Sequence, residues 1–240
     1  ICKICKREFE RGKINVSSAG TLLSFMEKPN FKMSFGFAQY CAEGNLCGDT
    51  IKTINDSRGH MVFIISDGMG KGSRAALDGA MGAGLLSKLL SAGFGFDSSL
   101  KVVNSALLVK SHEESLATLD CVRVDLFSGK CEFYKAGAPR SYIVKDDRLT
   151  KCELTSMPAG ILRGVEFAKR TTVLNTDDEI IMMSDGVTDV GNEWLEKFLR
   201  LETTLEPNEK AKAILKIALE NSDEKHRDDM SVIVAKMLER

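Results

Sequence analysis

His60-Met-Val-Phe-Ile-Ile-Ser66-Asp67-Gly68 is an apolar run that stops at an acid followed by a glycine. Glu179-Ile-Ile-Met-Met-Ser184-Asp185-Gly186 repeats this pattern later in the chain. An unbroken apolar run of this length is typical of a buried strand, and the glycine after it allows a sharp turn. A carboxylate is costly to bury unless it is paired or binds a metal. Two strands that end in this way therefore indicate a shared cation site.

The rest of the chain predicts strands that come as hairpins, with helices inserted in pairs. Strands are expected at residues 31–42, 50–55, 60–66, 119–126, 130–136, 140–145, 167–174, 179–184 and 231–237, and helices at residues 75–92, 98–111, 194–203 and 208–221. This order favours an α+β fold of antiparallel sheets covered by helices over a parallel sheet. Residues 1–30 are predicted as a linker and N-terminal helical segment, and residues 31–240 as one domain.

The composition is that of a globular protein, with 240 residues of which 43% are hydrophobic. The 33 Lys and Arg nearly balance the 34 Asp and Glu, so charge gives no indication of nucleic-acid binding, and we expect none. No apolar run approaches the ~18 residues of a membrane helix. The odd number of cysteines, 7, fits reduced thiols and a cytoplasmic domain. The chain begins at Ile1, so we expect a fragment of a longer protein, with any membrane anchor in the preceding region.

The turn at residues 56–59 sets the register of the first hairpin. A turn centred there places Asp49 opposite Ser66 or Asp67 on the neighbouring strand. Side chains directly opposed in an antiparallel pair lie about 4.5–5.5 Å apart at Cβ, and like charges there are destabilising. A divalent cation between the two carboxylates would reverse the sign of that interaction.

Further acids can reach the same end of the sheets. Asp185 ends the second run, and Asp228 and Asp229 open the last strand, so four acids are expected to converge at one rim. Ligation by oxygen alone selects hard cations such as Mg²⁺, Mn²⁺ or Ca²⁺. The alternative is that each Ser-Asp-Gly only turns the chain, which a single copy would favour. Two copies, together with the opposed Asp49, favour a metal site.

Two further stretches of sequence partly match known phosphate-handling motifs, but each departs from its motif at an essential position. Cys5 and Arg11 have the spacing of a cysteine phosphatase loop, but the five residues between them lack glycine. Residues 68–73 resemble a phosphate-binding loop, but Lys71 is followed by glycine rather than Ser or Thr. Lys71 therefore remains either a group near the cation site or a solvated surface residue.

The acidic motifs, taken in their order along the chain, resemble those of the bacterial PP2C-type (PPM) metal-dependent serine/threonine phosphatases. The motifs that carry the resemblance are Gly48-Asp49, Ser66-Asp67-Gly68-Met69-Gly70, Ser184-Asp185-Gly186 and Arg227-Asp228-Asp229-Met230-Ser231. Three more are similar to the stage II sporulation protein E phosphatase domain, namely Val103-Asn104-Ser105, Ala117-Thr118-Leu119-Asp120 and Pro158-Ala159-Gly160-Ile161-Leu162. The resemblance covers about Met33 to Met237.

The resemblance implies a four-layer α-β-β-α sandwich of two mainly antiparallel sheets, with two Mn²⁺ or Mg²⁺ ions at one end. It implies that Asp49 bridges the ions, that Asp67 and the Gly68 carbonyl bind the first, and that Asp185 and Asp228 bind the second. Asp229 and Lys71 are further candidates. The turn at residues 137–140 lacks the acid that holds a third metal in some members.

The implied activity is hydrolysis of a phosphoserine on a protein substrate by water activated between the two ions. The implied substrate is a phosphorylated anti-sigma-factor antagonist in sporulation control. The alternatives are a catalytically weak regulatory module on the same fold and a related stress-response phosphatase. The helices within residues 75–111 are a candidate homodimer or switch surface, because small residues such as Gly79, Gly82 and Gly84 permit close packing.

Overall fold

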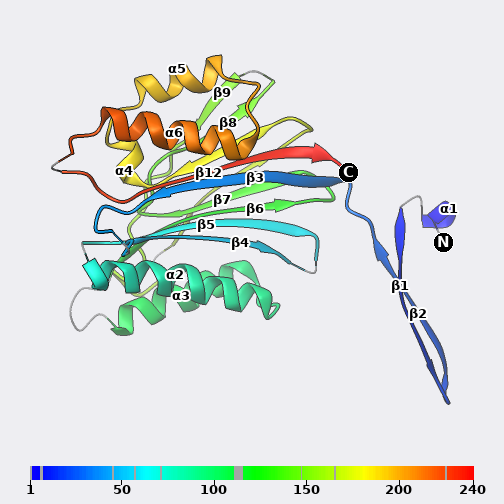
Figure 1. Ribbon diagram of the computed structural model, residues 1–240. Coiled ribbons are helices and arrows are strands. Elements are labelled where there is room, and N and C mark those ends of the chain that lie inside the picture. Colours follow the sequence, from blue (N-terminus) through cyan, green and yellow to red (C-terminus); the bar gives the residue numbers. More distant parts are fainter. Residues whose placement is uncertain are drawn as a thin grey trace.

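Two five-stranded sheets lie face to face, and helices cover the outer face of each (Figure 1). The structure, a computed structural model, describes residues 2–5, 8–44, 46–56, 58–70, 72–110, 116–146, 148–164, 166–224 and 226–240. The strand pairings in both sheets are antiparallel. The predicted α+β fold class and the α-β-β-α sandwich are confirmed.

The first sheet has the strand order β10-β7-β6-β5-β4. Its strands are β4 (Asp49–Asn55), β5 (His60–Gly68), β6 (Ala117–Asp125), β7 (Lys130–Ala136) and β10 (Ala168–Val173). The second sheet has the order β3-β12-β11-β8-β9. Its strands are β3 (Phe31–Tyr40), β8 (Ser141–Lys145), β9 (Arg148–Cys152), β11 (Glu179–Met183) and β12 (Met230–Glu239). The expected strands are present with bounds shifted by a few residues, and β9 is an addition that the sequence did not indicate.

Strand β5 shows why its sequence is apolar without a break. Phe63 and Ile65 lie in the core between the two sheets. Val62 and Ile64 point the other way, into the core beneath helices α2 (Gly72–Ser91) and α3 (Phe96–Lys110). Burial of each such side chain contributes about 1.5–3 kcal/mol. Because both faces of the strand are covered, polar alternation is absent, and the strand end is held rigidly.

Helix α2 packs closely on the first sheet because glycines face the strands. A Cβ on Gly79 would stand 2.1 Å from the carbonyl oxygen of Gly48, and one on Gly82 would stand 2.7 Å from Ser66 Oγ. The inference that these two glycines form a dimer surface is therefore wrong, since they contact the chain's own sheet. Gly84 has open space around its Cβ position. Dimerisation through residues 75–111 stays a prediction that no longer rests on Gly79 or Gly82.

The second sheet is covered by helices α5 (Glu193–Leu201) and α6 (Pro207–Asn221). Leu195, Leu199 and Ile214 fill the core between these helices and the strands. Helix α6 lies directly on β3, where a Cβ on Gly36 would stand 2.2 Å from Asn208 Cα. Within the described ranges, no helix is both long and apolar enough to cross a bilayer.

A buried ion pair of the first sheet, Lys135 with Asp120, is hydrogen-bonded to Ser141 of the second sheet near the end that carries the acids. Lys135 is fully buried, and its ammonium donates to Asp120 Oδ2 at 2.6 Å, to the Pro139 carbonyl at 2.6 Å and to Ser141 Oγ at 2.8 Å. Ser141 Oγ also donates to Asp120 Oδ2. Lys135 therefore fixes the turn at residues 137–140, where the sequence lacks a third-metal acid.

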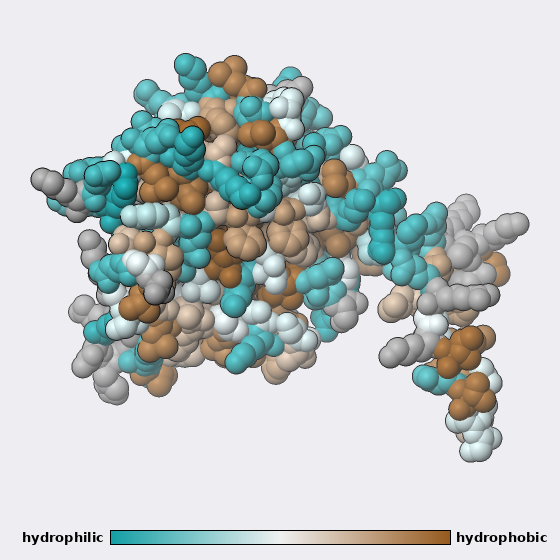
Figure 2. All heavy atoms as spheres, viewed as in Figure 1, coloured by the Kyte–Doolittle hydropathy of each residue, from teal (hydrophilic) through white to brown (hydrophobic). Residues whose placement is uncertain are grey.

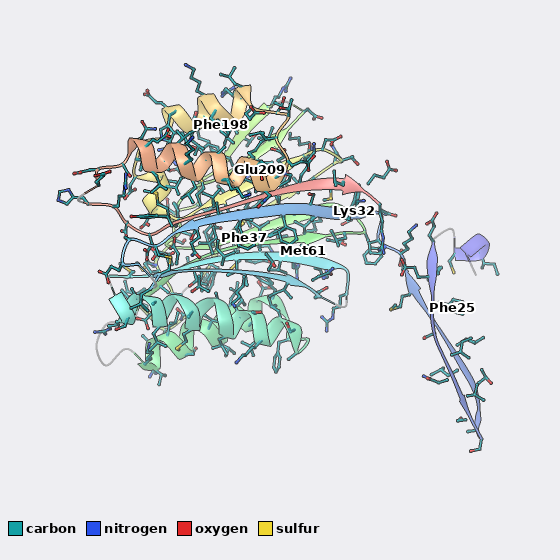
Figure 3. All side chains as sticks on the ribbon, in the orientation of Figure 1. Phe25, Lys32, Phe37, Met61, Phe198 and Glu209 are labelled. Atoms are coloured by element: carbon teal, nitrogen blue, oxygen red, sulfur yellow. The ribbon has the colours of Figure 1, made fainter. Side chains whose placement is uncertain are left out.

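The N-terminal region is a hairpin rather than the helical segment predicted for residues 1–30. Helix α1 (Cys2–Cys5) is followed by β1 (Phe9–Ser17) and β2 (Gly20–Glu27), which pair only with each other. The hairpin extends away from the sandwich (Figure 1), and its apolar side chains are visible on that arm in Figure 2. Phe25, labelled in Figure 3, belongs to this exposed set and is 43% exposed. A separate domain at residues 31–240 remains a prediction.

Candidate metal centre

Asp49 and Asp67 face each other at the end of the first hairpin. Asp49 is the first residue of β4, and its partner in the register is Asp67 of β5. The predicted register is therefore confirmed. Asp49 is only 3% exposed, so two carboxylates meet where little water can separate them.

Asp49 is surrounded by polar groups yet lacks hydrogen bonds to its carboxylate. Among the described residues, neither Oδ1 nor Oδ2 has a hydrogen-bond partner, although both atoms are buried. The hydroxyls of Ser184 and Ser231 lie close enough to lower its pKa, but neither completes a hydrogen bond of normal geometry. Gln39 Nε2 donates to the backbone carbonyl of Asp49 at 3.0 Å. The backbone is thus fixed while both carboxylate oxygens remain available to a ligand.

The two opposed carboxylates have strongly raised pKa values. Burial raises the pKa of Asp49 to about 6, assisted by the charges of Asp185 and Asp229 and opposed by the two serines. Burial also raises the pKa of Asp67 to about 8, with further contributions from Asp49, Asp185, Asp228 and Asp229. The charged forms are therefore unfavourable here unless a positive charge joins them.

The second sheet brings the other two predicted acids to the same end. Asp185 is the first residue of the short helix α4 (Asp185–Thr188), directly after β11, and Asp228 precedes β12. Burial raises the pKa of Asp185, and the charges of Asp189 and Asp228 add to this effect. Since Asp185 and Asp228 also raise the pKa of Asp67, the acids of both sheets share one electrostatic environment.

Two glycines of the repeated motif are required by close packing. A Cβ on Gly68 would stand 1.9 Å from the Ala75 carbonyl oxygen, so this glycine lets α2 begin beside the site. A Cβ on Gly186 would stand 2.2 Å from the Asp229 carbonyl oxygen. Gly186 therefore has a packing role beyond turning the chain. The role of the Gly68 carbonyl as a ligand remains a prediction.

Asp229 and Lys71 are the two further candidates for the cation site. Asp229 accepts backbone hydrogen bonds from Ala42, at 2.7 Å to Oδ1, and from Gly48 at Oδ2. Lys71 lies outside the described residues. A cavity of about 190 Å³ beside Asp228 and Asp229 is also lined by Glu43.

The polar neighbours of Asp49 were missed from the sequence. Ser231 accepts a hydrogen bond from Gln39 at 3.0 Å, and the Ser231 amide donates to Ser184 Oγ at 2.9 Å. Both serines are buried. The available signal was a serine inside or beside an apolar strand and within two residues of a predicted acid, since buried hydroxyls usually have a polar partner.

The donor set suits a hard divalent cation. The unpartnered oxygens of Asp49, the opposed Asp67 and the neighbouring Asp185 and Asp228 supply carboxylates, which Mg²⁺ and Mn²⁺ prefer. In the described part of the chain, no three His, Cys, Asp or Glu side chains stand close enough to enclose an ion by themselves. Mg²⁺ commonly completes its ligand shell with water.

Comparison with known proteins identifies the fold and the family. Stage II sporulation protein E of Bacillus subtilis (strain 168) is 28% identical over 222 residues, which make up 90% of this chain and 27% of that protein. The chain thus spans about a quarter of that relative's length. A solved structure of the PP2C phosphatase domain and a fragment of the regulatory domain of SpoIIE from Bacillus subtilis has a TM-score of 0.84 at 26% identity, covering 99% of this chain and 72% of that one.

A more distant structure shares the fold alone. The catalytic domain of the serine threonine protein phosphatase PstP, in complex with 2 manganese ions, has a TM-score of 0.69 at 19% identity, covering 87% of this chain and 100% of that one. The family model described as stage II sporulation protein E (SpoIIE) matches residues 57–238. The chain therefore belongs to the SpoIIE family, whose phosphatase domain has the PP2C fold.

Proposed function

We propose that this chain is a metal-dependent serine/threonine phosphatase that hydrolyses a phosphoserine on a protein substrate. The observation that carries the proposal is Asp49, a buried carboxylate with two unpartnered oxygens that stands directly opposite Asp67. Burial of two unneutralised acids in this way is costly, and a divalent cation removes the cost. Membership of the SpoIIE family supports the same activity.

The proposed ligands are those implied by the resemblance. In this proposal Asp49, Asp67 and the Gly68 carbonyl would hold one ion, and Asp185 and Asp228, together with Asp49, would hold a second. The mutual effects of these acids on their pKa values support this grouping. The manganese ions of PstP, which has the same fold, support Mn²⁺ or Mg²⁺ as the cofactor. When bound, two such ions activate water for attack and neutralise charge on a phosphoryl group.

The chain's own contribution is to hold these acids in place. Asp67 lies near the end of β5 and Asp185 follows β11, and the strand residues just before each acid are buried, where packed side chains move little. Gln39 restrains the backbone of Asp49. Preorganised ligands need no rearrangement as the substrate binds. In enzymes, electrostatic stabilisation of the transition state by preorganised groups is usually the largest contribution to the rate.

The proposed substrate is a phosphorylated anti-sigma-factor antagonist, dephosphorylated on serine. The support for this class is the similarity to stage II sporulation protein E in both sequence and fold. In this proposal the substrate approaches the rim where the acids lie, which borders the cavity beside Asp228 and Asp229.

The test is hydrolysis of a phosphoserine protein with Mn²⁺, Mg²⁺ and chelator in parallel. We expect activity with Mn²⁺ that falls by roughly a hundredfold or more in Asp49→Asn and Asp185→Asn. Glu224→Gln removes an exposed acid near the cluster and is expected to keep wild-type activity. Full activity of either aspartate variant at limiting Mn²⁺ would contradict the ligand assignment. A folded wild-type chain with no hydrolysis would favour the regulatory-module alternative.

A further inference from the structure

Asp229 uses both of its carboxylate oxygens to hold backbone amides far away in the sequence. Oδ1 accepts the Ala42 amide at 2.7 Å, and Oδ2 accepts the Gly48 amide. Its own amide donates to Asp228 Oδ1 at 2.8 Å. A carboxylate that accepts two backbone hydrogen bonds is held in one orientation, and those bonds are stronger than neutral ones.

These contacts connect Asp229 to the backbone next to each of the four acids, directly for three of them and through Gly48 and Gly68 for Asp67. Gly48 precedes Asp49, and the Gly48 carbonyl accepts the Gly68 amide at 3.2 Å, next to Asp67. On the other sheet, the Asp229 carbonyl lies against Gly186, which follows Asp185. Asp228 is its immediate neighbour.

We propose that Asp229 is a positioning residue of the cation site rather than a ligand of the ions. Its carboxylate holds the backbone amides of Ala42 and Gly48 and thereby sets the place of Asp49. This inference rests on the proposed function, because it assigns Asp229 a part in the same site. The geometry of Asp229 supports it, since each oxygen already accepts a backbone amide.

A carboxylate is required at this position by the geometry of the two donors. An ionised Asp offers an acceptor at each oxygen, whereas Asn offers one acceptor and one NH₂ donor. In Asp229→Asn, one of the two amides would face another donor, so one hydrogen bond is lost without a large change of shape. Loss of such a supporting contact typically weakens metal binding by about 10- to 100-fold.

The experiment measures amide exchange and Mn²⁺ binding in the full chain. Without metal, we expect the Ala42 or the Gly48 amide of Asp229→Asn to exchange roughly tenfold faster by NMR. By calorimetry, we expect Asp229→Asn to bind the same number of Mn²⁺ ions as the wild type, with affinity lowered about 10- to 100-fold.

Two controls separate position from charge and from ligation. Glu43→Gln removes one negative charge from the same cavity and is expected to leave amide exchange and Mn²⁺ affinity within about twofold of the wild type. Asp228→Asn removes a proposed ligand, so it is expected to lower the number of bound ions while both amides stay protected.

Two results would overturn the inference while leaving the proposed function standing. One is unchanged exchange of both amides in Asp229→Asn. The other is a reduced number of bound ions in that variant with intact amide protection, which would make Asp229 a ligand. Absence of Mn²⁺ binding by the wild-type chain would instead overturn the proposed function, and this inference with it.

Discussion

Gly79 of helix α2 lies directly against the carbonyl oxygen of Gly48, at a distance that leaves no room for a side chain. A Cβ on Gly79 would be 2.1 Å from that oxygen. Gly48 precedes Asp49, so the helix presses on the backbone that carries the most buried acid of the site. The contact joins the packing of a helix to the placement of a candidate ligand.

Gly79→Ala is expected to destabilise the protein by about 1–3 kcal/mol, because the added methyl group forces the helix and the strand apart. Gly84→Ala is the matched control, since nothing lies within 4 Å of its Cβ position. That variant is expected to gain up to about 1 kcal/mol from helix propensity. Urea unfolding measures both. Equal stability of the two variants would contradict the close approach of α2.

Mn²⁺ is expected to raise the melting temperature of the wild-type chain, because a ligand that binds only the folded state stabilises it. Asp49→Asn is expected to lose this response. Without metal, the same variant is expected to be more stable than the wild type by about 1–3 kcal/mol, because a buried unpartnered carboxylate has been neutralised. Thermal scans with chelator and with Mn²⁺ check both effects. A lower melting temperature of Asp49→Asn in chelator would refute the second.

Acid stability depends on Glu132 in β7. Burial acts to raise its pKa, but hydrogen bonds from Lys130, Lys169 and Arg123 outweigh burial and lower the pKa to about 2. Since the pKa is lower in the folded state, the stabilisation is complete above the unfolded value of about 4.5 and is lost as pH falls towards 2. Glu132→Gln is expected to lose about 2 kcal/mol at pH 7 and to show a flatter decline between roughly pH 5 and 2.

Urea unfolding across that pH range tests the role of Glu132. The control is Glu153→Gln, which alters an ion pair with Arg140 in which Glu153 is 61% exposed. Exposed pairs contribute little, so this variant is expected to follow the wild-type pH curve. Identical curves for all three proteins would contradict the prediction.

The N-terminal hairpin is expected to be dispensable for folding of residues 31–240. An ion pair between Arg240 and Glu10 joins this region to residues 31–240, and both side chains are partly exposed. Such pairs contribute about 0–1 kcal/mol each. Deletion of residues 1–27 is therefore expected to change the free energy of unfolding by less than about 2 kcal/mol. Loss of the cooperative transition would show that the hairpin belongs to the folded unit.

The opposed acids could be predicted because their signals are local. The turn at residues 56–59 fixed the hairpin register by counting, and this placed Asp49 opposite Asp67. The apolar runs before Asp67 and Asp185 are long enough to identify buried strands. Both features depend on residues close together in the chain.

Other features depend on residues that are distant in sequence. Asp229 accepts amides from residues 187 and 181 positions away, which no local pattern can indicate. Gly79 and Gly82 suggested an exposed small-residue surface, but only the packed helix shows that they face the sheet. The hairpin of residues 9–27 was missed because its charged residues are compatible with a helix, and the exposed strand β2 has no buried face to impose a period of two.

Strand β12 lies between β3 and β11, so the strand that comes latest in the order of the two sheets occupies the interior of the second sheet. Asp228 and Asp229 directly precede it, and β3 has its partner only when β12 is in place. A nascent chain still lacking β12 can form the hairpin of β4 and β5, but it cannot assemble the rim that both sheets share. Synthesis of β12 is therefore required before the site can be completed, and a nascent chain that stops short of this strand cannot act through the site.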